Sequence, residues 1–122
     1  MAKKLTKKQI ESLAKEVRQF LLDHEMWSDV RIYFNGKAFS TDDGRGNYYY
    51  NDPENLVVLE DVDPSDYVEY TSDILTMTFE GPLYECLNYW FGKTEEEFRS
   101  IFRKYGLYYE LGYAWSLAAF PL

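Results

Sequence analysis

The sequence predicts a single α+β domain over residues 1–122, with a mostly antiparallel sheet of about five strands. An N-terminal helix and two later helices are expected to pack on one face of that sheet. Two observations lead to this prediction. Apolar residues recur at steps of three and four in three segments, as on the buried side of a helix. In the runs between those segments, apolar and polar residues alternate, as in strands joined by short turns.

The first helix is predicted to begin after Thr6 and to end at residues 23–25. Thr6 and Gln9 have the spacing of a capping box, in which each side chain bonds the backbone amide of the other residue. The stripe expected to face the core consists of Ile10, Leu13, Ala14, Val17, Phe20, Leu21 and His24.

Residues 30–41 predict a β-hairpin. Asn35-Gly36 supplies the two positive φ angles that a type I′ turn requires. The turn then places Phe34 opposite Lys37 and Ile32 opposite Phe39. In this register the apolar residues share one face, as a half-buried hairpin requires.

The middle of the chain is predicted to hold two further strands, at residues 56–59 and 74–80, and one candidate strand before them. Tyr48–Tyr50 form a candidate extension of the sheet, and Leu56–Leu59 predict a short buried strand because four apolar residues follow one another. Asp63-Pro64 indicates one helical turn over residues 64–67, since Asp is a good cap and Pro suits the first helical position. Residues 74–80 predict a strand with Leu75, Met77 and Phe79 in the core and Thr76, Thr78 and Glu80 in solvent.

Two helices and a strand are predicted after residue 80. The second helix would begin at Gly81-Pro82 and end at Gly92, with Leu83, Cys86, Leu87 and Trp90 on its apolar side. A second capping box, Thr94 to Glu97, marks the third helix, which Gly106 ends and whose core side is Phe98, Ile101, Phe102 and Tyr105. Residues 107–120 alternate throughout and predict one long strand inside the sheet. The small residues on one of its faces indicate close packing there: Gly112, Ala114, Ser116 and Ala118.

Charge is distributed very unevenly along the chain. Residues 47–92 contain ten acids and no Lys, Arg or His, which gives this acidic segment a net charge of −10. Residues 1–46 have a net charge of +2, and residues 93–122 have a net charge of zero. Like charges repel one another in a compact state, so this pattern indicates a use for the negative charge. The alternative is that the acids only keep the protein in solution.

The acidic segment is also rich in tyrosine, which gives interfaces a large rigid contact area with a polar tip. We therefore predict a partner-binding surface made of Asp52, Glu54, Glu60, Asp61, Asp63, Asp66, Tyr67, Glu69, Tyr70 and Asp73. Its expected partner is a basic protein, in particular one that binds nucleic acid. Direct binding to nucleic acid or to an anionic membrane is not expected, because the chain carries a net charge of −8. A structural subunit or a homodimer, with the tyrosines forming the interface, is an alternative.

No catalytic or cofactor motif stands out in the sequence, and no enzyme or cofactor site is predicted. His24 is expected to pack or cap the first helix, and Cys86, the only cysteine, is expected to be a buried thiol. An EF-hand loop beginning at Asp61 would need Gly at its sixth place and Glu at its twelfth, where this chain has Asp66 and Ser72. A looser divalent-cation site, or a small enzyme that uses the carboxylates, stays as an alternative.

A single cysteine rules out an intrachain disulfide, and no apolar run is as long as a membrane span, so a cytoplasmic protein is expected. In composition the chain is similar to small acidic inhibitors encoded by phages and mobile elements, such as anti-CRISPR and antirestriction proteins. It is equally similar to immunity proteins that neutralise nuclease toxins. Both resemblances imply a non-catalytic inhibitor, and the first implies a nucleic-acid mimic that occupies a basic groove.

Overall fold

The computed structural model describes residues 4–89 and 92–122. Within these residues, six strands form one antiparallel sheet in the order β3-β2-β1-β4-β6-β5. The strands are β1 Val30–Phe34, β2 Lys37–Ser40, β3 Val57–Leu59, β4 Thr76–Phe79, β5 Leu107–Leu111 and β6 Ser116–Pro121. The helices are α1 Lys7–Asp23, α2 Pro82–Asn88 and α3 Lys93–Lys104, and a 3₁₀ turn, η1, spans Pro64–Asp66. The α+β prediction is confirmed, with six strands in place of about five.

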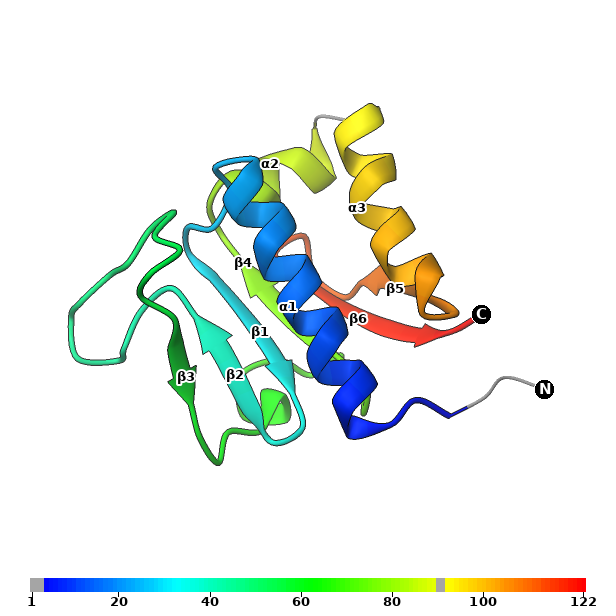
Figure 1. The fold of residues 1–122 in the computed structure, drawn as a ribbon, viewed down its shortest axis with the longest axis horizontal. Coiled ribbons are helices and arrows are strands. Elements are labelled where there is room, and N and C mark those ends of the chain that lie inside the picture. Colours follow the sequence, from blue (N-terminus) through cyan, green and yellow to red (C-terminus); the bar gives the residue numbers. More distant parts are fainter. Residues whose placement is uncertain (1–3, 90–91) are drawn as a thin grey trace.

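The helices lie together on one face of the sheet (Figure 1). Helix α1 packs on β1 and α3, and α3 packs on β5. The core between the two layers is almost wholly apolar and includes Leu13, Val17, Ile32, Met77 and Phe98, each fully buried. No helix in the described part of the chain is long and apolar enough to cross a membrane.

The first helix and the hairpin agree with their predictions in bounds and register, but His24, at the end of the stripe expected to face the core, is exposed. The capping box is present, with Gln9 N donating to Thr6 Oγ1 and Thr6 N donating to Gln9 Oε1. In the hairpin, Phe34 is opposite Lys37 and Ile32 is opposite Phe39. Both turn residues, Asn35 and Gly36, have positive φ. The hairpin was predicted to be buried on one face only, but Tyr33, on the face away from the helices, is also buried.

Two predictions for the middle of the chain were only partly correct. Tyr48–Tyr50 add a single bridge, between Asp42 and Tyr48, and no strand. The strand at β3 exists but is not buried, because it is the edge of the sheet while α1 packs on β1. Val58 is therefore 39% exposed although it is apolar. The expected turn at η1 is present, and Asp63 caps it.

The expected solvent face of β4 is mostly covered. Thr76 is fully buried and Thr78 partly buried, while Glu80 is exposed. The cover is the segment between β3 and β4, which crosses this face and whose Ser72 N donates to Thr76 Oγ1 over 3.0 Å. The alternation of apolar and polar residues predicted one solvent-exposed face for this strand. That prediction was wrong for Thr76 and Thr78 because β4 is covered on both faces.

Helix α2 begins where predicted and buries Leu83, Cys86 and Leu87. It ends at Asn88, before the predicted stop at Gly92, and the predicted core residue Trp90 lies outside the described residues. The second capping box was wrong. Gly92 is the N-cap of α3, so Thr94 lies inside the first turn and caps nothing. Phe98, Ile101 and Phe102 are buried as expected, and Gly106 follows the helix with φ +75°.

The single long strand predicted over residues 107–120 was also wrong, because the chain reverses direction within it. Strands β5 and β6 form a hairpin in which Leu111 is opposite Leu117, with residues 112–115 as the turn. Gly112 N donates to Ser116 O, and Ser116 N donates to Tyr113 O, which closes the turn. The interior position is correct for β6, which pairs with both β4 and β5.

The close packing predicted on the small side of this region is found at Gly112. A Cβ built on Gly112 would lie 2.6 Å from Tyr70 Cβ and 2.9 Å from Tyr70 Cγ. These atoms are close to the Tyr70 backbone, so the ring cannot simply swing away. Glycine at this position thus allows the segment between β3 and β4 to lie against the β5–β6 turn.

We expect Gly112→Ala to lower the free energy of unfolding by about 1–3 kcal/mol, the usual cost of overpacking. Urea unfolding of the variant and the wild type measures the difference. In a Tyr70→Gly background the same substitution should cost much less, because the clashing atoms are gone. A Gly112→Ala protein as stable as the wild type would show that Tyr70 does not pack there.

Candidate functional site

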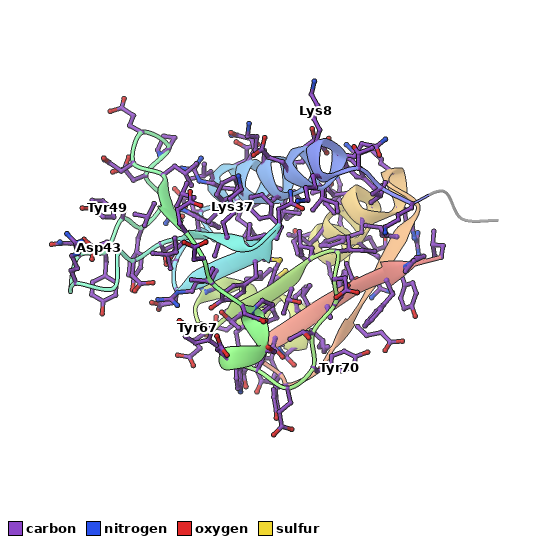
Figure 2. All side chains as sticks on the ribbon, turned by 90° about the horizontal axis from the view of Figure 1, so that it is seen from below. Lys8, Lys37, Asp43, Tyr49, Tyr67 and Tyr70 are labelled. Carbon is purple, nitrogen blue, oxygen red and sulfur yellow. The ribbon has the colours of Figure 1, made fainter. Side chains whose placement is uncertain are left out.

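Six acids of the acidic segment lie in the connection between β3 and β4, residues 60–75. Because β3 is an edge strand and β4 is internal, this connection must pass across β2 and β1. It does so on the face opposite the helices: in Figure 2, α1 runs along the upper side of the sheet and η1 lies on the lower side. All six carboxylate residues are exposed: Glu60, Asp61, Asp63, Asp66, Glu69 and Asp73. We call the surface that they form with Tyr67 the acidic face.

Aromatic side chains fasten the connection to the sheet. The Tyr67 ring stacks on Tyr33, with centroids 5.7 Å apart, and the Arg31 guanidinium lies over it at 5.6 Å. Tyr70 packs against Phe120 at 5.7 Å. Val68, between the two tyrosines, is buried, whereas Tyr67 keeps 54% of its surface exposed. Tyr67 is thus both an anchor and part of the acidic face.

Tyr70, predicted as a partner-binding residue, makes an internal contact. Its hydroxyl donates to Glu110 Oε2 over 2.6 Å, which joins the connection to β5. The hydrogen bond to this carboxylate raises the pKa of Tyr70 to about 12. Ser72 completes the attachment, since its hydroxyl donates to the carbonyl of Ala119.

Asp63 holds the 3₁₀ turn in place. Its carboxylate accepts from Ser65 N over 2.9 Å and from Ser65 Oγ over 2.7 Å, and Pro64 occupies the first position of the turn. The bond from the Ser65 hydroxyl, followed by that from the Ser65 amide, lowers the pKa of the Asp63 carboxyl. Among the predicted acids, Asp63 therefore has a structural role.

A shallow depression brings three predicted acids near the turn of the first hairpin. It has a volume of about 410 Å³ and is lined by residues of 33–36, 61–64 and 71–74, among them Asp61, Asp63 and Asp73. A hydrogen bond joins the connection to the hairpin turn, since Val62 N donates to Gly36 O over 3.0 Å. The described residues contain no group of three or more His, Cys, Asp or Glu that could hold a metal ion.

The structure places two predicted residues apart from the others. Asp52 and Glu54 belong to a loop beside α1, whose Arg18 donates to the Asp52 carbonyl over 3.2 Å. The Asp52 carboxylate accepts from Asn55 Nδ2, and this bond lowers the pKa of Asp52. The predicted surface is thus divided, with eight of its ten residues in the connection and two beside the helical layer.

The basic side chains of the strands are already paired. The strands contain two bases, and one of them, Lys37, reaches Glu11 on α1 at 3.3 Å. The other, Arg31, lies on the face opposite the helices and donates to both carboxylate oxygens of Asp42 at 3.1 and 3.2 Å. Burial acts to raise the pKa of Asp42, but hydrogen bonds from Arg31 and Ser40 outweigh it and lower the pKa. The six carboxylates of the connection therefore have no strand cation to neutralise them.

Sequence reasoning missed two aromatic residues beside the acidic face. Tyr113 and Trp115 stack with centroids 5.0 Å apart and ring planes 7° apart. Both sit in the β5–β6 turn, and Tyr113 is 42% exposed. The signal that a turn separates two strands was Gly112, which the regular alternation of the neighbouring residues concealed.

The only histidine and the only cysteine, His24 and Cys86, both belong to the helical layer. His24 is the C-cap of α1, as expected; its ring packs against Phe20 with centroids 4.3 Å apart and planes tilted by 37°, and Nε2 lies 3.8 Å from Glu97 Oε2. Cys86 is fully buried, and burial raises the pKa of its thiol. No hydrogen bond joins the two residues in the described structure, and neither lines the depression near Asp61.

Comparisons with models of protein families, with curated proteins and with solved structures gave no match to this chain.

The Tyr70–Glu110 contact has a clear dependence on pH. The unfolded phenol titrates near pH 10, and the folded one at about 12. The stabilisation is therefore complete below pH 10 and disappears as the pH rises toward 12. We expect Glu110→Gln to bring the Tyr70 pKa back toward its ordinary value, measured from the Tyr70 ring signals by NMR. Glu96→Gln, an exposed acid of α3, is the control, and an unmoved pKa in Glu110→Gln would refute the contact.

The burial of Cys86 predicts slow reaction with a thiol reagent in the native state, because the thiol is covered and its pKa is raised. The measurement is the rate of labelling in buffer and in denaturing urea, with the unfolded chain as the control. Fast labelling of a chain that circular dichroism shows to be folded would mean that the thiol is accessible.

Proposed function

We propose that this protein is a non-catalytic binding module whose acidic face docks on the basic, nucleic-acid-binding surface of another protein. One observation carries the proposal. Six exposed carboxylates lie on one face of the sheet, and the strand base on that face, Arg31, is already bound to Asp42. The resulting negative field is available to a partner.

The arrangement of the carboxylates favours binding over catalysis. General acid–base or metal chemistry needs groups that converge on one reacting atom. Here the carboxylates follow one another along a connection that crosses an open face, and the two titratable groups suited to nucleophilic chemistry, His24 and Cys86, belong to the helical layer. A spread of negative charge with an exposed tyrosine suits a broad, positively charged protein surface.

A surface of this kind imitates one property of nucleic acid, a concentration of negative charge on one surface. A protein that binds phosphates with Lys and Arg gains much of its affinity from that charge, so an acidic protein can compete for the same groove. We infer an inhibitor that acts by occupancy. An immunity protein that covers a nuclease toxin would use the same chemistry, and the two proposals differ only in the identity of the partner.

The test compares charge reversal on and off the acidic face. The reversed variant carries Asp66→Lys, Glu69→Lys and Asp73→Lys, and its matched control carries Asp23→Lys, Glu85→Lys and Glu96→Lys in the helical layer. Both variants have the same net charge. Asp61 and Asp63 are left unchanged, because Asp61 has φ +53° and Asp63 caps η1. Exposed substitutions of this kind each usually change stability by less than about 0.5 kcal/mol.

We expect the wild type and the control to capture the same basic proteins from a host extract, and duplex DNA to displace them. The reversed variant should not capture them. With a purified partner, its association should be at least about tenfold slower than that of the wild type, with a weaker dependence on salt. A reversed variant that folds and associates at the wild-type rate, with the same salt dependence, would show that the acids only solvate the surface. Self-association as the sole interaction would instead favour the homodimer.

A further inference from the structure

A shallow pocket on the edge of the acidic face combines aromatic rings with carboxylates. It has a volume of about 290 Å³. One wall is the end of η1 and the segment that follows it, with Asp66 and Glu69, and the other is the stacked pair Tyr113 and Trp115 from the β5–β6 turn. Two segments far apart in the sequence thus supply two different kinds of group to one small volume.

Elsewhere in this chain, an aromatic ring and a carboxylate together bind an arginine side chain. The Arg31 guanidinium lies over the Tyr67 ring at 5.6 Å and binds both oxygens of the Asp42 carboxylate. The ring attracts the cation through its negative face, while the carboxylate supplies hydrogen-bond acceptors in the plane of the guanidinium. An aromatic ring and a carboxylate therefore act together on one arginine.

A second arginine is held in the same way on the other side of the sheet. The Arg99 guanidinium lies 5.5 Å from the centroid of the Tyr109 ring and forms an ion pair with Glu95. The pattern therefore occurs with an arginine in two separate places, and in both the ring is that of a tyrosine. It occurs once with a lysine, since the Lys37 ammonium lies 5.5 Å from the centroid of the Phe34 ring and 3.3 Å from Glu11 Oε1.

The pocket on the edge of the acidic face contains aromatic rings and carboxylates, but no cation of the described residues lies in it. Among the described residues, no Arg or Lys side chain lies over Tyr113 or Trp115, and none forms an ion pair with Asp66 or Glu69. The aromatic pair is also partly exposed, since Tyr113 keeps 42% of its surface.

We propose that this pocket binds an arginine side chain of the partner, with its guanidinium on the Tyr113–Trp115 pair and its charge facing Asp66 and Glu69. The inference rests on the proposed function and specifies the residue that the acidic face recognises. Arginine suits the pocket better than lysine, because a guanidinium is planar, stacks on aromatic rings and is less strongly hydrated than an ammonium group. The pocket would then select arginine from among the basic residues that the whole face attracts.

The experiment is an NMR titration of the full chain with two peptides of equal charge, hexa-arginine and hexa-lysine. We expect the indole N–H signal of Trp115 and the ring signals of Tyr113 to shift with hexa-arginine. Its dissociation constant should be about two- to fivefold lower than that of hexa-lysine, the preference that an exposed cation–π contact provides. Hexa-glutamate, which should leave the spectrum unchanged, controls for non-specific effects.

Two variants separate the aromatic contribution from the charge. Tyr113→Leu should remove the preference for hexa-arginine and leave the affinity for hexa-lysine nearly unchanged. Tyr113→Phe should keep the preference, because the ring is retained. Both should fold, since the bonds that close the turn at residue 113 come from its backbone.

The outcomes distinguish this inference from the proposed function. Equal binding of both peptides, with shifts confined to the connection and none at Trp115, would overturn the arginine pocket and support the acidic face as a docking surface. A preference that survives Tyr113→Leu would overturn the pocket as well. If neither peptide shifts any signal of the acidic face, both the pocket and the proposed function are wrong.

Discussion

The structure depends on covering the second face of its sheet. The helices cover one face, and the other, which carries Tyr33 and Thr76, would face water without the connection between β3 and β4. Tyr67 stacks on Tyr33, Val68 is buried, and Tyr70 lies against Gly112. Removing this apolar surface from water stabilises the fold. A segment of irregular backbone thus does the work that a second layer of helices performs in other domains.

This cover also explains how the fold tolerates its charge. Apolar anchors in the connection alternate with acids, so that fixing the anchors to the sheet turns the carboxylates outward. In water the repulsion between exposed charges is weak and is screened within about 10 Å at moderate salt. The contacts of Tyr67, Tyr70 and Ser72 hold the segment in place against it. The segment that covers the second face of the sheet and the segment that forms the acidic face are therefore the same sixteen residues, 60–75.

Local signals in the sequence predicted local structure well, except for the capping box at Thr94, because the N-cap of α3 is Gly92. The capping box at Thr6, the Asn35-Gly36 turn and the Asp63-Pro64 pair each depend on a few neighbouring residues, and each is present. Features that depend on tertiary position were not predictable in the same way. Alternation continues from Leu107 to Ala118 because both strands of a hairpin alternate, so the pattern alone concealed the reversal at residues 112–115. The exposure of the acids followed from their charge, whereas the pairing of Asp66 and Glu69 with Tyr113 and Trp115 depends on where the connection crosses the sheet.

The central claim is that negative charge is concentrated on the face opposite the helices, and it can be measured without a partner. A cationic and an anionic nitroxide, added in turn, relax nearby amide protons according to the local electrostatic potential, because counter-ions accumulate where the field attracts them. We predict that the amides of residues 60–73 relax far more with the cationic nitroxide than with the anionic one, while those of α1 and α3 show little difference. An equal preference for the cationic nitroxide over the whole surface, or a larger one over the helices, would contradict the acidic face.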